Sequence, residues 1–350
     1  MLGRSSKLAA AALTALMGGS LLLADIVVAE TMRIGVSWRH FQEERWKIDE
    51  AGIKNVLGPS GYEYVSTDAQ ADPIKQLADV ESLIASGVDA LIVLAQDSQA
   101  ILPALEVAHA NGIPVIAYDA PIDDPQSVFV SFDNVAVGRL MAEAMVAAQP
   151  DGNWALIEGD SAHSIVNIFR EGQMQVLQPL IDAGTITVVG QQNIENWRPD
   201  AAQAAVDQIL TANNNDVQAI LAMNDGMSGG AAAALEAQGL TDVALSGQDG
   251  ETASLNRIAK GQQTVTIWKN AYNLGEAAAQ AALELAKGMS ASDLPGITVT
   301  QTASGKDQPA ILLEPIAITS DNLNLVVEAE WISKDALCAG VSQDGAAICN

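Results

Sequence analysis

Short apolar runs alternate with longer amphipathic stretches along most of this chain of 350 residues. The apolar runs are rich in β-branched residues and too short for helices, so they predict buried parallel strands. These runs are Arg33–Ser37, Ala90–Leu94, Pro114–Tyr118, Trp154–Ile157, Ile186–Val189, Ala219–Ala222 and Val243–Ser246. The stretches between them that predict helices include Pro73–Ser86, Ala100–Asn111, Asn134–Gln149 and Pro199–Ala212.

Glycine marks the ends of several predicted helices, and a strand follows soon after each one. Gly87, Gly112 and Gly184 stand at such points, where glycine can take the left-handed conformation that ends a helix. The βαβα order predicts an α/β fold with parallel sheets and helices on both of their faces.

The N-terminal segment has the pattern of a secretory signal peptide. Arg4 and Lys7 precede an apolar run over residues 8–24, and short side chains lead up to Ala29. A membrane anchor is the alternative, but the run is shorter than the roughly 20 residues that cross a bilayer. We therefore expect cleavage after Ala29 and a mature protein in the periplasm. The roughly 320 residues that remain predict two lobes rather than one core.

The net charge excludes one large class of partners. The formal charge is −26 at pH 7, and it becomes −27 without residues 1–29, which contain Arg4, Lys7 and Asp25. A surface of this sign repels phosphate backbones and anionic headgroups. We therefore expect no nucleic-acid partner.

The two cysteines, Cys338 and Cys349, both lie in the last stretch of the chain. In an oxidising compartment they predict a local disulfide that closes a short tail loop. Because no histidine or second cysteine pair lies near them, we expect neither a metal site nor a cofactor.

Polar side chains collect directly after the predicted strands. Ligands of open parallel sheets bind beyond the carboxyl ends of the strands. The residues at these positions are Trp38, Arg39, Gln96, Asp97, Asp119, Glu158, Asp160, Asn224, Asp225, Gln248 and Asp249. A helix cap or turn is the alternative for each of them, and it is the better interpretation for Asp225, which precedes a glycine-rich helix start.

Acids, amides and indoles in this arrangement suit a neutral polyol, since each hydroxyl both donates and accepts hydrogen bonds. Charge-assisted hydrogen bonds contribute about 1.5–3 kcal/mol each. A handful of them, offset by the cost of immobilising the ligand, would reach the ~8 kcal/mol of micromolar binding. Trp38, Trp46 and Trp197 are the candidates for stacking on the C–H faces of a sugar.

Enzyme signatures are absent or incomplete. The chain has no Gly-x-Gly-x-x-Gly and no phosphate-loop Gly-Lys-Ser/Thr. Gly226-Met-Ser228-Gly-Gly230 matches a nucleophile elbow, but that elbow needs a later histidine, and none follows His163. A glycosidase pair such as Asp119 and Asp249 is the enzymatic alternative. We expect a binding protein without catalytic residues.

A family resemblance covers nearly the whole mature chain. The segments that carry it are Glu44-Arg45-Trp46, Ala117-Tyr-Asp119, Val130–Asn134, Phe169–Met174, Leu210–Asn215, Asn224-Asp225 with Gly229-Gly230, Ser246–Asp249 and Trp268-Lys269. In this order and spacing they resemble the D-xylose-binding periplasmic proteins of ABC transporters, more than the ribose or galactose branches.

The resemblance implies a type I periplasmic-binding fold, with two Rossmann-like lobes, three hinge segments and a monosaccharide in the cleft. It places residues 30–131 and 270–312 in the N-terminal lobe, 132–269 and 313–335 in the C-terminal lobe, and 336–350 in a tail. The sugar contacts it implies are Arg45, Asp119, Trp197, Asn224, Asp249 and Lys269. The implied partner is a membrane permease, and the protein is expected to be a monomer.

The chain departs from the family pattern at three positions. Ala120 stands where the family has Arg, while His163 and Ile165 stand where it has Asp and Asn contacts. We keep His163 as a candidate sugar contact. The departures predict xylose or a related pentose or hexose that places apolar or extra bulk near Ala120 and Ile165.

Two rival functions share this architecture. A periplasmic sensor that reports the sugar to a chemoreceptor or kinase would have the same sequence features. A regulator related to sugar-responsive repressors is the weaker rival. This chain has a secretory start, shows no helix-turn-helix in its sequence, and carries a formal charge of −26 that would repel DNA.

Overall fold

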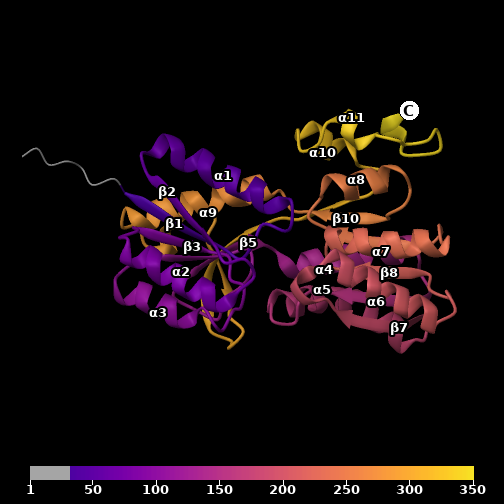
Figure 1. The fold of residues 1–350 in the computed structure, drawn as a ribbon, viewed down its shortest axis with the longest axis horizontal. Coiled ribbons are helices and arrows are strands. Elements are labelled where there is room, and N and C mark those ends of the chain that lie inside the picture. The colour runs from indigo at the N-terminus through magenta and orange to yellow at the C-terminus, as the bar shows by residue number, and fades with distance from the viewer. Residues whose placement is uncertain (1–31) are drawn as a thin grey trace, which may run out of the picture. The chain divides into compact units, whose positions relative to one another are not determined.

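Two mostly parallel β-sheets organise residues 32–350, the part of the chain that this computed structural model describes (Figure 1). Across the first sheet the strands are β11 (Thr298–Gln301), β12 (Asp307–Leu313), β5 (Val128–Phe132), β4 (Val115–Tyr118), β3 (Ala90–Val93), β1 (Arg33–Trp38) and β2 (Glu63–Asp68). Across the second they are β13 (Ile316–Ile318), β10 (Val265–Trp268), β9 (Ala244–Gln248), β8 (Ala219–Ala222), β6 (Gly152–Glu158) and β7 (Ile186–Asn193). β11 and β13 are the antiparallel strands. The expected signal peptide lies outside the described residues.

Each sheet carries its own helices, and each sheet with its helices is called a lobe below. The first lobe has α1 (Arg45–Ser60), α2 (Pro73–Ala85), α3 (Leu102–Ala110) and α9 (Ala271–Ala286). The second lobe has α4 (Asn134–Ala148), α5 (Ile165–Asp182), α6 (Pro199–Ala212), α7 (Asp225–Gln238) and α8 (Thr252–Ala259). Because helices cover both faces, the central strands β3 and β4 are buried at every residue.

The fold class expected from the alternation of runs is confirmed. Every predicted strand and helix occurs, and most bounds agree within one or two residues. Gly87, Gly112 and Gly184 all have positive φ angles, of 79°, 72° and 70°, as the predicted helix ends require.

Glycine pairs let helices of one lobe approach closely. A Cβ on Gly52 of α1 would lie 2.2 Å from the Tyr272 carbonyl of α9, and one on Gly275 of α9 would lie 2.2 Å from the Asp49 carbonyl. Neither position has room for a side chain. The resulting α1–α9 contact fixes α1 on its sheet, and α1 begins with Arg45.

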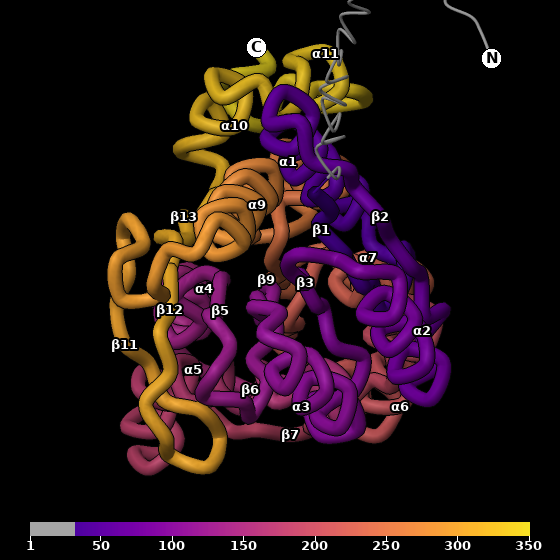
Figure 2. The backbone as a smooth tube through the Cα atoms, turned by 90° about the vertical axis from the view of Figure 1, so that its left-hand side faces the viewer, coloured from indigo at the N-terminus to yellow at the C-terminus, as the bar shows by residue number. Residues whose placement is uncertain are grey.

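Within residues 32–350 the chain passes between the lobes three times, after β5, after β10 and between β12 and β13. β12 returns to pair in parallel with β5, far from it in sequence (Figure 2). At the same place the Asp133 amide donates to the Leu313 carbonyl at 2.9 Å. Hinge motion about these segments stays a prediction.

The C-terminal tail packs on α8 of the second lobe (Figure 1). It contains α10 (Asn324–Glu328) and α11 (Lys334–Leu337), and its apolar side chains form a small separate core with α8 and β10. Cys338 and Cys349 are joined by a disulfide, with 5.3 Å between their Cα atoms. No helix in residues 32–350 is both long and apolar enough to span a bilayer.

Candidate functional site

Side chains from the carboxyl ends of both sheets meet in one cavity between the lobes. Asp119 follows β4 of the first lobe, while Asn224 and Asp249 follow β8 and β9 of the second. Lys269 stands where the chain leaves β10 for the first lobe, and Arg45 begins α1. This is the position that open parallel sheets give to their ligands.

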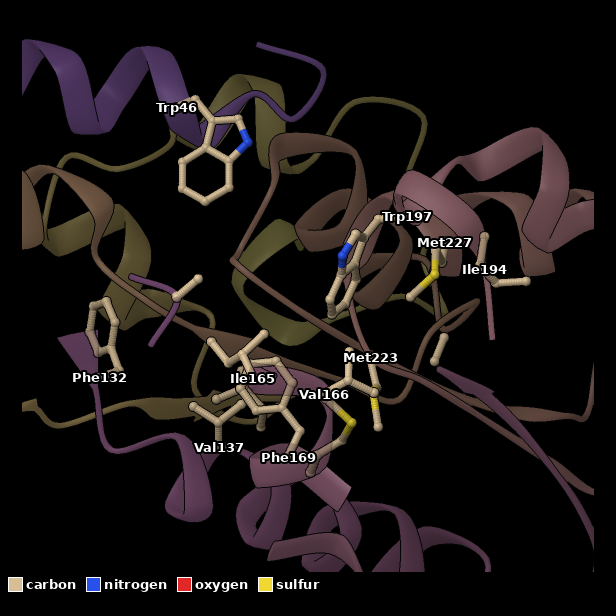
Figure 3. Close-up of a cluster of buried hydrophobic side chains, with 14 of the residues drawn as sticks. Trp46, Phe132, Val137, Ile165, Val166, Phe169, Ile194, Trp197, Met223 and Met227 are labelled. Atoms are coloured by element: carbon tan, nitrogen blue, oxygen red, sulfur yellow. The ribbon is translucent and has the colours of Figure 1, made fainter. Parts of the chain in front are cut away.

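The cavity has an empty volume of about 340 Å³ and mixes charged, amide and apolar walls. Its polar lining residues are Arg39, Glu43, Arg45, Asp119, Asn224, Gln248, Asp249 and Lys269. Its apolar and aromatic lining residues are Trp46, Ala120, Ile165, Phe169 and Trp197. Figure 3 shows Trp46 and Trp197 on different sides of this space, with Ile165 and Phe169 forming another wall.

Arg45 is the centre of an ion-pair network that joins the lobes. Its guanidinium lies 2.9 Å from Asp119 and 3.0 Å from Asp249, and its Nε lies 3.2 Å from Asp49. Lys269 lies 3.4 Å from Asp119 and 3.5 Å from Asp249. Both site aspartates thus face both cations, and each cation contacts carboxylates of both lobes.

Burial and charge act in opposite directions on these groups. Burial alone would raise the pKa of Asp119, but Arg45 and then Lys269 outweigh it and lower this pKa to about 2. Asp49 lies deeper, and its burial outweighs Arg45 and raises its pKa to about 6. Asp119 is therefore a permanently ionised acceptor at neutral pH.

The two site aspartates share an unusual backbone conformation. Asp119 has a φ of 57° and Asp249 a φ of 105°, in the region that side-chain-bearing residues rarely adopt. Such positions cost about 1–3 kcal/mol and persist only when their surroundings hold them. Both carboxylates that face the cavity therefore stand on backbone that their surroundings must hold in place.

The ring of Trp46 packs against two guanidinium groups. The guanidinium of Arg45 lies 4.4 Å from the ring centroid and that of Arg39 lies 5.0 Å from it. The indole Nε1 of Trp46 donates to Glu43 at 2.5 Å. These contacts fix the orientation of the ring that lines the cavity.

A second group of contacts joins the lobes at His163. Its Nδ1 lies 3.1 Å from Arg39 of the first lobe and accepts from Trp197 Nε1 at 2.7 Å. Burial, and then the charge of Arg39, lower the pKa of His163 to about 3, so the ring is neutral. His163 does not line the cavity; it contacts two residues that do.

Sequence reasoning missed part of the lining. Arg39 and Gln248 belong to the polar residues at strand ends, but the pattern does not distinguish them as contacts, and Glu43 gives no signal because it precedes a helix. All three are buried, and each has a side-chain atom without a hydrogen-bond partner in the described part of the chain: Arg39 Nε, Glu43 Oε1 and Gln248 Oε1. Buried polar atoms normally have partners, so these three are available to a ligand.

Other candidates have structural partners instead. Trp38 is fully buried in the first lobe, where its Nε1 donates to the Tyr64 hydroxyl at 2.9 Å, and it does not line the cavity. The capping interpretation of Asp225 is wrong, because Asn224 caps α7 by accepting from the Met227 amide. Asp225 accepts instead from Ser254, Thr266 and the Glu251 amide.

Comparison with known proteins agrees with this arrangement. Residues 34–290 match the family described as periplasmic binding protein domain. The D-xylose-binding periplasmic protein of Escherichia coli (strain K12) is 36% identical over 320 residues, which cover 91% of this chain and 96% of that protein. The protein of the same name from Haemophilus influenzae is 36% identical over 318 residues, covering 90% and 95%.

A solved structure agrees in fold over nearly its whole length. The carbohydrate transporter solute-binding protein of Chloroflexus aurantiacus, in complex with D-glucose, has a TM-score of 0.79 at 29% identity, covering 87% of this chain and 98% of that one. These relatives are solute-binding proteins and not enzymes. The chain therefore belongs to the periplasmic binding protein family and, within it, to the sugar-binding proteins related to the D-xylose-binding periplasmic proteins.

Proposed function

We propose that this chain captures a neutral monosaccharide between its lobes in the periplasm, as a monomer, and delivers it to the permease of an ABC transporter. The relatives named above support the class of ligand and the transport role. The finer identity of the ligand is a proposal from the cavity itself.

The balance of charge in the cavity carries the proposal. The charged lining residues are Arg39, Arg45, Lys269, Glu43, Asp119 and Asp249. Formal positive and negative charges are equal in number, so an anionic sugar acid or phosphate would bring an unpaired charge into a buried space, which is costly. A neutral ligand adds no charge to this buried space.

Polar atoms that have no hydrogen-bond partner in residues 32–350 suit hydroxyl groups, and one of them, Glu43 Oε1, lies 3.5 Å from an Arg39 nitrogen in an ion pair. Arg39 Nε is a donor, while Glu43 Oε1 and Gln248 Oε1 are acceptors. A hydroxyl can accept from the first and donate to either of the others, which neither a pure donor nor a pure acceptor can do. The empty space of about 340 Å³, which includes the mouth of the cavity, favours one sugar ring over an oligosaccharide.

The apolar wall bears on which sugar is bound. Ala120, Ile165 and Phe169 line the cavity without hydrogen-bonding side chains, and a sugar hydroxyl buried against them would lose about 1–3 kcal/mol. We propose xylose or a related pentose or hexose that turns a C–H or methyl group toward this wall.

Calorimetric titration with D-xylose, L-arabinose, D-glucose, L-fucose and D-glucuronate tests the proposal. We expect at least one neutral sugar to bind at micromolar concentration or below, and D-glucuronate not to bind. Asp249→Ala should weaken that binding about tenfold or more, as expected for losing a charge-assisted hydrogen bond. Asp200→Ala, which removes an exposed carboxylate paired with Arg198, is the control. Tighter binding of D-glucuronate than of every neutral sugar would overturn the proposal.

A further inference from the structure

The backbone turn at Asp249 and Gly250 holds one of the two carboxylates of the cavity in a strained conformation. The φ angles are 105° at Asp249 and 72° at Gly250. A residue with a side chain keeps such a conformation only when neighbouring groups fix it. The direction of the Asp249 carboxylate therefore depends on whatever holds this turn.

Strand β10 supplies part of the support. The Asp249 amide donates to the Ile267 carbonyl at 2.9 Å, and the Gly250 amide donates to Thr266 Oγ1 at 3.2 Å. Trp268 packs against the turn so closely that a Cβ on Gly250 would lie 2.6 Å from its ring. These contacts leave the Gly250 carbonyl to be satisfied from elsewhere.

The C-terminal tail supplies that partner. Trp331, between α10 and α11, donates its indole Nε1 to the Gly250 carbonyl at 2.6 Å. Its ring meets the Trp268 ring edge-on, with 5.7 Å between centroids. Trp331 is absent from the lining of the cavity; it lines a neighbouring pocket beside Asp249 and Gly250, and its hydrogen bond to the turn is its direct link to the Asp249 carboxylate.

The tail is itself anchored to the second lobe. Asn256 of α8 donates to the Leu337 and Ala339 carbonyls at 2.7 and 2.9 Å. The Ala346 amide donates to the Ala259 carbonyl at 2.9 Å. Together with the disulfide at Cys338, these bonds give Trp331 a fixed platform.

We propose that Trp331 is a positioning residue for ligand binding: through the Gly250 carbonyl, the C-terminal tail holds the Asp249 carboxylate where it meets Arg45 and Lys269. The inference rests on the proposed sugar-binding function for its affinity readout, and it adds to that function a role for a segment that lies outside the cavity.

Trp331→Phe tests the proposal, because it removes the indole N–H and keeps an aromatic ring against Trp268. We expect the dissociation constant for D-xylose or D-glucose, whichever the wild type binds, to rise about tenfold, equivalent to about 1.4 kcal/mol. Trp154→Phe is the matched control. Trp154 is fully buried, so the smaller phenyl ring should leave a void that lowers the melting temperature. Its Nε1 has no partner among the described residues, and it does not line the cavity, so the affinity should stay unchanged. A purely structural role for Trp331 would instead make affinity follow melting temperature in both variants.

Two further measurements complete the test. In an Asp249→Asn background, Trp331→Phe should change the dissociation constant less than twofold, because residues that act through one another are not additive. Hydrogen–deuterium exchange should be faster over residues 249–251 in Trp331→Phe than in Trp154→Phe, with or without sugar. Unchanged exchange at 249–251, or sugar affinity equal to wild type, would overturn the role of Trp331. Accelerated exchange in a protein that binds no sugar would leave the positioning role standing and count against the proposed function alone.

Discussion

Arg39 of the first lobe donates to His163 of the second, with 3.1 Å between the guanidinium and Nδ1. The same Nδ1 also accepts from Trp197 Nε1 at 2.7 Å. Since both partners can only donate, the ring must be neutral with its proton on Nε2. Adding a second proton would place a donor where two donors already point, beside the charge of Arg39.

This geometry predicts a pH-dependent contribution of His163 to stability. Its pKa is about 3 in the folded protein and 6.5 as the ordinary value. Between these values the unfolded chain binds a proton that the folded protein excludes, so this contribution is complete above about pH 6.5 and is lost as the pH falls toward about 3. The loss is at most about 1.4 kcal/mol per pH unit.

Urea unfolding of wild type and His163→Gln between about pH 7.5 and about pH 4.5 measures the pH-dependent contribution of His163 to the free energy of unfolding. Glutamine keeps an acceptor for Arg39 and Trp197 but does not titrate. Other buried groups titrate too, including His40, whose pKa burial and Arg39 lower to about 3, and they are present in both proteins. We expect the stability advantage of the wild type to shrink with acidification. A difference that is the same at every pH would contradict this account.

Removing Arg45 should lower the free energy of unfolding of the protein as well as weaken sugar binding. Arg45→Met leaves the carboxylates of Asp49, Asp119 and Asp249 buried without their principal cation. Breaking a buried pair in this way costs about 3–5 kcal/mol. Urea unfolding measures the loss of unfolding free energy. This loss should be smaller at lower pH, where the carboxylates can be protonated.

Arg139→Met is the matched control for Arg45→Met. Arg139 also pairs with an acid four residues on, Glu143, but both side chains are more than 40% exposed. Exposed pairs contribute about 0–1 kcal/mol. Equal losses in the two variants would show that Arg45 is not a buried network centre.

The sequence predicted the sheets and their order of elements well, because buried parallel strands and amphipathic helices leave strong patterns. It also predicted that Asp119, Asn224 and Asp249 would lie together, since the carboxyl ends of parallel strands meet at one edge. Arg45 and Lys269 came only from the family resemblance, as one begins a helix and the other lies in a crossing segment.

The rest of the site depends on contacts that no local pattern encodes. Glu43 reaches the cavity because Trp46 and Arg39 hold its carboxylate. The pairing of His163 with Arg39 spans 124 residues. Trp38 is the last residue of β1, at the end where cavity residues are expected, yet its side chain turns into the core toward Tyr64. Side-chain direction after a strand was the information that the sequence lacked.

The lobes are also joined at Asn196, next to Trp197. Its Oδ1 accepts from Gln96 and its carbonyl accepts from Gln42, at 2.9 and 3.2 Å, both across the lobes. Asn196 has a φ of 52°, which glycine adopts freely, so Asn196→Gly removes only the bond to Gln96. Loss of one neutral hydrogen bond, about 0.5–1.5 kcal/mol, should speed sugar dissociation roughly two- to tenfold in stopped-flow chase experiments. Gln280→Ala, which removes an exposed bond to Glu284, should leave the rate unchanged.

Gly159 gives the sharpest test of Trp197 as part of the site. A Cβ on Gly159 would lie 2.1 Å from the Trp197 ring, a distance at which the ring must move. The clashing ring atoms lie next to the Nε1 that donates to His163, so movement of the ring breaks that bond or pushes the indole into the cavity. Gly159→Ala should therefore weaken sugar binding about tenfold or more, on the scale of one lost hydrogen bond and its unpaired partner.

Gly58→Ala is the control, since nothing lies within 4 Å of a Cβ there and alanine inside α1 should stabilise the helix by about 0.5–1 kcal/mol. If calorimetry found wild-type affinity in Gly159→Ala, Trp197 would have no part in holding the sugar.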